Sequence, residues 1–251
     1  MENKIALVTG GSRGLGKDMA LSLAKKGINV ILTYNTNREE AQKVVREIES
    51  NKLKAAAVQL DVADLSKQQD FFDNVGAVLS SWETDRIDFL INNAGTGATI
   101  PFMDVTEADF DRLTNIHLKG TYFLTQKALR IMNDNGGIVF ISSGTTRYCV
   151  PGYSVYSPLK AAVEVLTKYI AKEMGGRGIR ANVVAPGPIE TDFNNAAIRN
   201  NPAMKQNLSN MTALGRVGNA DDIGSVVAFL CTEDAKWING QRIEVSGGLT
   251  L

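Results

Sequence analysis

Residues 5–16 read IALVTGGSRGLG, a short apolar run followed by a turn with glycines at positions 10, 11, 14 and 16. The apolar run predicts a buried strand, and the apolar spacing of residues 15–26 predicts a helix directly after the turn. Glycines let the backbone turn tightly and approach a pyrophosphate, which would then lie at the helix N-terminus. Because the turn stands between a first strand and a helix, we interpret it as a nucleotide-binding turn rather than an ordinary tight turn.

The rest of the chain continues the alternation of strand and helix. We expect strands at residues 5–9, 29–34, 55–60, 89–92, 138–142, 179–185 and 242–246, and helices at 15–26, 38–51, 66–82, 107–132, 154–175 and 221–230. This alternation is typical of βαβ units with parallel strands. The prediction is an α/β fold with one domain over residues 1–251, a doubly wound seven-stranded parallel sheet with helices on both faces. The asparagine-rich residues 188–213 are expected to form an irregular lid over the substrate.

The composition narrows the classes of function. Lys and Arg number 27 and Asp and Glu number 27, which argues against a nucleic-acid binder or a membrane-surface binder. A single histidine, His117, argues against a His-rich metal site and a Ser-His-Asp hydrolase, and we expect no metal. Two cysteines, Cys149 and Cys231, fit a reducing compartment. With no run of about 18 apolar residues and no signal-peptide pattern at the start, we expect a cytoplasmic protein.

Polar and glycine-rich clusters follow several of the predicted strands. They are Asn92–Gly95, Ser142–Gly144 and Pro186–Pro188. Ligands of open α/β sheets bind beyond the carboxyl ends of the strands, so we expect these clusters to converge. Tyr156 and Lys160 stand four residues apart at the start of a helix and therefore share one face. A nearby ammonium favours a phenolate, so we expect Lys160 to lower the pKa of Tyr156.

Taken in order, these motifs resemble the short-chain dehydrogenase/reductase family, and within it the 3-oxoacyl-carrier-protein-reductase-like group. The resemblance covers essentially the whole chain. It implies a Rossmann-type fold and hydride transfer between a nicotinamide and a carbonyl or alcohol carbon. One departure is Ser246-Gly247-Gly248, where the family often has Asp-Gly-Gly, which puts a local turn or subunit contact in doubt. The matching positions are Thr9, Gly10, Gly14, Gly16, Asn92–Gly95, Asn115, Ser143, Tyr156, Lys160, Asn182, Pro186, Gly187 and Thr191.

The resemblance implies a role for each catalytic residue. Tyr156 would be the general acid that protonates the carbonyl oxygen during reduction. Ser143 would hydrogen-bond the same oxygen, and Lys160 would bond the nicotinamide ribose. Asn115 would anchor a water molecule that links Lys160 to solvent. His117 is expected to be a helix residue near Asn115 without a catalytic role.

The resemblance also implies the contacts of the cofactor. Asn93 and Gly95 look like the wall of the adenosine ribose, and Asp61 resembles a contact to the adenine amine. Ile189 and Thr191 resemble the residues that hold the carboxamide. The complete set of expected cofactor-binding residues is Gly10, Ser12, Arg13, Gly14, Leu15, Gly16, Tyr34, Asn35, Arg38, Asp61, Val62, Asn93, Ala94, Gly95, Tyr156, Lys160, Pro186, Gly187, Ile189 and Thr191.

The end of the second strand favours NADP (NADPH) over NAD. An NAD enzyme of this fold usually has an acidic residue there to bind the ribose 2′-hydroxyl. Residues 34–36 read Tyr-Asn-Thr, without a carboxylate. Arg13 and Arg38 stand near this place, and the forked donors of arginine suit a 2′-phosphate. Glu39 and Glu40 would oppose that charge.

We therefore predict an NADP-dependent ketone reductase acting on a 3-oxoacyl-like or other small carbonyl compound. Two alternatives remain: a dehydrogenase that oxidises a sugar, steroid or secondary alcohol, and a non-catalytic NADP-binding regulator. The joint presence of Ser143, Tyr156 and Lys160 disfavours the regulator. Residues 132–137 carry no cation, so we expect an acyl-carrier-protein thioester not to be the preferred substrate. The alternative is docking through other cations, namely Arg130, Arg177, Lys127 or Lys168. The resemblance also implies a homotetramer, with no nucleic-acid or membrane partner.

Overall fold

A computed structural model describes residues 4–251, apart from the side chains of residues 194 and 195. Seven strands form one sheet in the order β3-β2-β1-β4-β5-β6-β7, and every neighbouring pair is parallel. This confirms the predicted seven-stranded parallel sheet. The strands are β1 Ile5–Val8, β2 Asn29–Tyr34, β3 Ala55–Gln59, β4 Ile87–Asn92, β5 Met132–Ile141, β6 Arg180–Pro186 and β7 Arg242–Val245.

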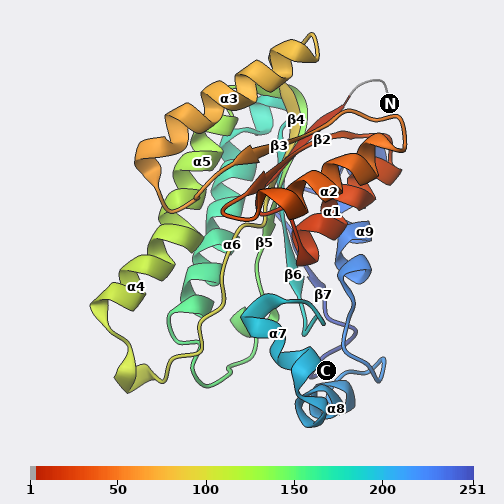
Figure 1. The fold of residues 1–251 in the computed structure, drawn as a ribbon. Helices are drawn as coiled ribbons and strands as arrows, with labels where there is room; N and C mark the ends of the chain where they lie inside the picture. Colours follow the sequence, from red (N-terminus) through yellow and green to blue (C-terminus); the bar gives the residue numbers. More distant parts are fainter. Residues whose placement is uncertain (1–3) are drawn as a thin grey trace.

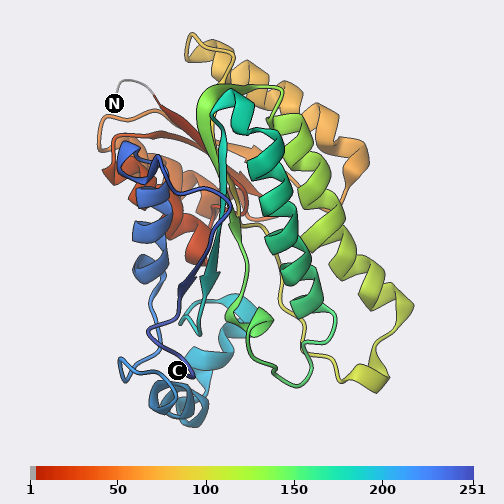
Figure 2. The same cartoon turned by 180° about the vertical axis from the view of Figure 1, so that it is seen from behind.

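Helices cover both faces of this sheet, as predicted for a doubly wound fold. Helices α1, α2 and α9 lie on one face, and α3, α5 and α6 lie on the other (Figure 1 and, from behind, Figure 2). The principal helices are α1 Gly14–Lys25, α2 Arg38–Glu49, α3 Gln68–Ser81, α4 Glu107–Thr114, α5 Thr121–Ala128, α6 Tyr156–Glu173, α7 Phe193–Asn200, α8 Pro202–Asn210 and α9 Ala220–Leu230; a π-helical segment, η3 Asn115–Gly120, joins α4 to α5.

The apolar core is split by the sheet into two clusters, because successive residues of a strand point to opposite faces. In β1, Ala6 and Val8 pack in the cluster with α1, α2 and α9. Ile5 and Leu7 pack in the cluster with α3, α5 and α6. All four residues are buried, which explains why a central strand covered on both faces reads as a continuous apolar run.

The order of the strands determines where the ligand-binding crevice lies. From β1 the chain moves outward through β2 to β3, then returns to β4 on the other side of β1 and continues to β7. The strand order therefore reverses between β1 and β4, and a crevice opens beyond the carboxyl ends of these two strands. The glycine-rich turn after β1 and the polar residues after β4 meet in this crevice.

Two regions differ from the sequence-based expectation. Residues 188–213 are not irregular throughout, since they contain α7 and α8, which lie at the carboxyl edge of the sheet (Figure 2). Helix α8 begins after Asn201, whose side chain accepts a hydrogen bond from the Met204 amide, and has Pro202 in its first turn. Strand β5 begins at Met132 rather than at 138. Among the described residues no helix is long and apolar enough to cross a membrane.

Candidate active site

A cavity of about 530 Å³ lies at the carboxyl edge of the sheet. Its volume is in the range of small-molecule and cofactor sites. Residues that follow β1, β2, β3, β4, β5 and β6 all contribute to its wall. The predicted convergence of the strand ends is therefore found in the structure.

The glycine-rich turn forms the floor of the cavity. Gly10 has a φ of +66°, which favours glycine. A Cβ on Gly16 would lie 2.0 Å from the carbonyl oxygen of Gly10, so no side chain fits there. Helix α1 then begins with an extended Arg13, and within its described first turn there is no side-chain cap and no acidic residue. The first N–H groups of α1 and the positive end of its dipole therefore remain available to an anion.

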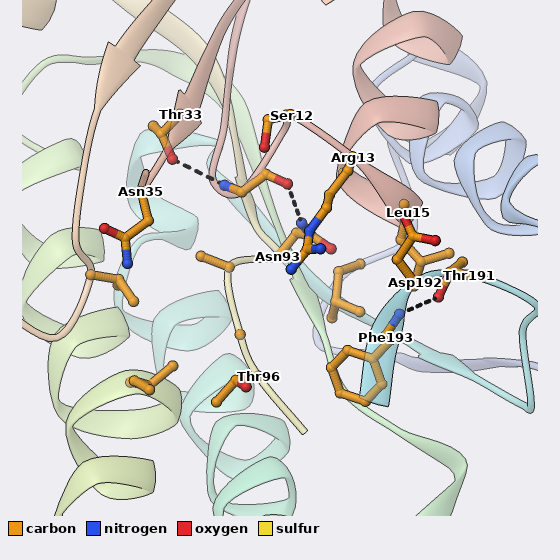
Figure 3. Close-up of a pocket in the computed structure, with 18 of the residues that line it drawn as sticks. Ser12, Arg13, Leu15, Thr33, Asn35, Asn93, Thr96, Thr191, Asp192 and Phe193 are labelled. Atoms are coloured by element: carbon orange, nitrogen blue, oxygen red, sulfur yellow. Dashed lines mark hydrogen bonds between the residues drawn. The ribbon is translucent and has the colours of Figure 1, made fainter. Parts of the chain in front are cut away.

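Asn93 ties this turn to the end of β4. Its side-chain amide donates to the carbonyl oxygens of Thr9 at 2.9 Å and Gly10 at 3.2 Å. Its backbone amide donates to the Thr9 hydroxyl at 2.9 Å. Figure 3 shows Asn93 beside the turn, with Arg13 directed toward the same hollow. Asn93 therefore holds the two sides of the crevice together, a contribution that sequence reasoning did not assign to it.

Three side chains of the expected catalytic set meet at the other end of the cavity. Tyr156 is the first residue of α6, and Lys160 follows one turn later on the same face. The Lys160 ammonium lies 5.6 Å from the centre of the Tyr156 ring and donates to the carbonyl oxygen of Ile141 at 2.8 Å. Ser143 stands just after β5, where its hydroxyl accepts from the amide of Thr145 at 3.2 Å. Ser143, Tyr156 and Lys160 all line the cavity.

Burial determines the protonation states of these groups. It raises the pKa of Tyr156 well above its usual value, although a hydrogen bond with Ser143 acts in the opposite direction. Burial also lowers the pKa of Lys160 to about 8. The expected lowering of the Tyr156 pKa by Lys160 is therefore not found in the protein alone, because desolvation of the phenolate dominates. A phenol that keeps its proton at neutral pH is suited to act as a general acid.

Comparison with known proteins agrees with this geometry. The family model described as enoyl-(acyl carrier protein) reductase matches residues 10–250. The chain belongs to the short-chain dehydrogenase/reductase family. Its members are oxidoreductases, so the predictions of the family and of an NAD(P)-dependent oxidoreductase are confirmed.

Individual members of the family indicate the kind of reaction. A hydroxynaphthalene reductase-like protein of Metarhizium brunneum is 35% identical over 99% of this chain and 95% of its own length. A solved promiscuous reductase that catalyses keto-reduction at C1 in lugdunomycin biosynthesis is 36% identical, with a TM-score of 0.93 over 99% of this chain and 98% of its own. A solved angucycline C-6 ketoreductase with bound NADP is 34% identical, with a TM-score of 0.93 over 98% of this chain and 95% of its own. These similarities support the predicted NADP-dependent ketone reduction.

Most of the cofactor-binding residues expected for this short-chain dehydrogenase/reductase line the cavity, and their contacts with a cofactor stay predictions. Arg38 is the exception, because it is exposed in the first turn of α2 and lies outside the wall. Asp61 lines the cavity, and its carboxylate also accepts from the amide of Ala63 at 3.0 Å, as a turn residue does. The expected residues found in the wall are Gly10, Ser12, Arg13, Gly14, Leu15, Gly16, Tyr34, Asn35, Asp61, Val62, Asn93, Ala94, Gly95, Tyr156, Lys160, Pro186, Gly187, Ile189 and Thr191.

Asn115 is the catalytic candidate that the structure does not bring to the cavity. It lies half-buried at the start of η3 and is not part of the wall. His117, two residues later, is buried in the wall instead. Of these two residues of η3, His117 faces the cavity and Asn115 does not. Phe193, an apolar residue of the segment 188–213 that was not among the expected site residues, lines the cavity from the start of α7 (Figure 3). The one available signal for His117 was that it is the only histidine in the chain.

Proposed function

We propose that this protein reduces a ketone to a secondary alcohol with NADPH as the hydride donor. The observation that carries the proposal is the meeting of Ser143, Tyr156 and Lys160 in one cavity, next to a glycine turn shaped for a dinucleotide. The ketone reductases among the relatives support the direction of the reaction. The solved relatives with bound NADP support the choice of cofactor.

The residues of the cavity fit such a cofactor. The missing side chains at Gly10 and Gly16 let the turn pack closely against Asn93 and Ala94. The N-terminus of α1 can then meet a pyrophosphate in the cavity that this turn lines. Arg13 lines the same end of the cavity, is exposed, and has no ion-pair partner in the described part of the chain. Its guanidinium is therefore available to a 2′-phosphate. Glu40 also lines this rim, where its carboxylate is 2.6 Å from the Lys43 ammonium, which offsets part of its charge.

The reaction follows from the positions of the three catalytic candidates. When bound, NADPH supplies the hydride that adds to the carbonyl carbon. Ser143 would donate a hydrogen bond to the carbonyl oxygen and hold it near Tyr156. The buried phenol of Tyr156 gives its proton to that oxygen as negative charge develops. Lys160, with its pKa at about 8, is mostly an ammonium at neutral pH and stabilises the resulting phenolate.

Aromatic side chains around Tyr156 favour a flat aromatic ketone as the substrate. The ring of Tyr153 lies edge-on to Tyr156 at 5.7 Å, and the ring of Phe193 lies at 6.4 Å. Phe193 is 45% exposed, so it has apolar area left for a ligand. The similarity to a hydroxynaphthalene reductase-like protein and to an angucycline ketoreductase agrees with this substrate class.

A carrier protein is disfavoured as the bearer of the substrate. Arg177, a cation near the loop that begins β5, is already paired with Asp134 at 2.7 Å. It also donates to the carbonyl oxygens of Leu129 at 2.9 Å and Met132 at 2.6 Å. Arg177 therefore offers an acidic carrier protein little free positive charge, and the exposed Arg130 is the remaining cation beside this loop.

Consumption of NADPH by the purified protein tests these proposals. The substrates are a fused-ring aromatic ketone, a 3-oxoacyl thioester of a small thiol and the same acyl group on carrier protein. We expect the highest kcat/KM with the aromatic ketone. Turnover of none of them would contradict the reductase proposal. A large advantage of the carrier protein that fades with salt would contradict the substrate class alone.

We further propose a cytoplasmic homotetramer. Helices α5 and α6 lie on the same side of the sheet (Figure 2). Tyr122 and Phe123 on α5, and Val165 and Tyr169 on α6, are exposed. Exposed apolar side chains on neighbouring helices are typical of a subunit interface. The free thiols support a reducing compartment. Sedimentation of wild type and Tyr169→Glu tests the assembly, and a wild-type monomer would contradict it.

A further inference from the structure

His117 is a buried side chain in the wall of the cavity that the proposed mechanism does not use. It lies in η3 and is 2% exposed. Its Nε2 is 2.8 Å from the carbonyl oxygen of Thr96. Because a carbonyl oxygen can only accept, Nε2 carries the hydrogen and donates it, which fixes the tautomer of the imidazole.

The other ring nitrogen, Nδ1, is buried against the loop that follows β4. Nδ1 of His117 is buried and has no hydrogen-bond partner among the described residues. A Cβ on Gly95 would lie 2.9 Å from Cε1 and 3.3 Å from Nδ1, so the imidazole edge packs directly on the Gly95 backbone. A proton on Nδ1 would therefore have no acceptor, and protonation would place an unpaired charge in a dry position.

The charges around the imidazole also oppose protonation. Burial is the largest cause, and the nearby cations of Lys160 and Arg112 add to it, so that the pKa of His117 falls to about 3. The hydrogen bond to Thr96 acts in the opposite direction and is outweighed. Tyr156, the other titratable group that the ring faces, keeps its own proton. His117 is consequently neutral at every pH at which the enzyme would be assayed, and neither nitrogen is free to exchange a proton with a substrate.

The imidazole nevertheless contacts the residue that transfers the proton. The rings of His117 and Tyr156 lie 5.1 Å apart at 87°, an edge-to-face contact. Tyr153 contacts the same phenol ring edge-on. Since Tyr156 is the first residue of α6, only one side of its backbone is held by the helix. These ring contacts therefore help to set the orientation of the phenol toward a carbonyl oxygen.

We propose that His117 is a positioning residue, a neutral imidazole that is anchored to Thr96 and holds the ring of Tyr156 in the orientation needed for proton transfer. The proposal rests on the proposed function, because it acts through Tyr156. It explains why the cavity contains a histidine that cannot act as an acid or base. It also gives a role to His117, which the sequence analysis had expected to be a helix residue without a catalytic role.

Three variants test the proposal with the full-length protein. His117→Ala removes both the anchor and the ring contact, and His117→Phe keeps a ring beside Tyr156 without the bond to Thr96. Lys119→Ala is the matched change two residues away, at an exposed position of η3 outside the cavity wall. Since a misplacement of about 1 Å can cost about 10²-fold in rate, we expect His117→Ala to lower kcat by about that factor. His117→Phe should recover part of the loss, and Lys119→Ala should change kcat little.

The measurements separate positioning from folding and from acid–base chemistry. Thermal melting and NADPH binding should stay close to wild type, while the solvent deuterium isotope effect on kcat rises as proton transfer becomes limiting. If His117→Ala does not fold, the same measurements are made on His117→Phe. The solvent deuterium isotope effect on its kcat then tests the proposal. A kcat of His117→Ala above about half of wild type would overturn the proposal. So would a limb of the wild-type pH profile between about pH 6 and 7 that disappears in His117→Phe, since this would show a titrating histidine. Failure of the wild-type protein to reduce any ketone would contradict the proposed function instead.

Discussion

Lys160→Met should abolish turnover and at the same time remove a cost to stability. Lys160 is 7% exposed, and burial holds the pKa of its ammonium at about 8 instead of 10.5. Each pKa unit corresponds to about 1.4 kcal/mol, so keeping this ammonium buried at pH 7 costs about 3 kcal/mol. Methionine has a similar volume and no charge. The variant leaves the carbonyl oxygen of Ile141 without its donor, which costs about 1 kcal/mol, so we expect a net gain of about 2 kcal/mol at pH 7.

The dependence of this gain on pH is the sharper test. Between pH 8 and 10.5 the unfolded chain binds more protons at Lys160 than the folded protein does, so the stability of the wild type rises with pH over this range. The variant lacks that rise. Its advantage over the wild type should therefore shrink by about 2–3 kcal/mol between pH 7 and pH 10.

Urea unfolding at four pH values from 7 to 10 measures the difference. Both proteins are studied without cofactor and at one protein concentration, because ligands and subunit association shift apparent stability. All other titrating groups are common to both proteins and cancel in the difference. A stability difference that does not change with pH would refute the depressed pKa of Lys160, whatever the activity of the variant.

Three further predictions concern the catalytic and cofactor-binding residues and the segment 188–213. Tyr156→Phe should keep the fold and NADPH binding but lower kcat by about 10²–10⁴-fold, because Phe has no proton to give; more than half of wild-type turnover would exclude Tyr156 as the acid. Arg13→Ala should lower the ratio of kcat/KM for NADPH over NADH by about tenfold or more, while the matched Arg38→Ala, outside the cavity, should change it little; equal effects would place the 2′-phosphate elsewhere. Residues 188–213 should be cleaved by protease more slowly when NADP and substrate are bound, and equal cleavage with and without them would argue against a lid.

Much of this architecture is set by local patterns in the sequence. The strands and most helices are at the predicted places, because apolar spacing records which face of an element is buried. The glycine turn is readable for a similar reason, since Gly10 and Gly16 are required by local backbone geometry and close approach. Tyr156 and Lys160 meet because positions four apart in a helix always share a face.

Other features depended on contacts between segments far apart in the chain. The sequence did not show that the π-helical segment Asn115–Gly120 turns His117, rather than Asn115, into the cavity. It placed Arg38 with Arg13, although only Arg13 reaches the cavity wall. It also left residues 188–213 without regular structure, where short helices in fact carry Phe193 to the site.

The protonation states show most clearly which properties follow from the local sequence and which depend on the tertiary structure. From the sequence, an ammonium one turn from a phenol predicts a lowered pKa for Tyr156, because the pair is local and its attraction can be read from the spacing. In the folded protein, burial outweighs that attraction and raises the pKa of Tyr156, lowers that of Lys160 to about 8, and lowers that of His117 to about 3. Which residues share a helix face is fixed by the helix itself, and the sequence alone determined it. How far each group is removed from water depends on every element that packs around it, and only the tertiary structure decided it.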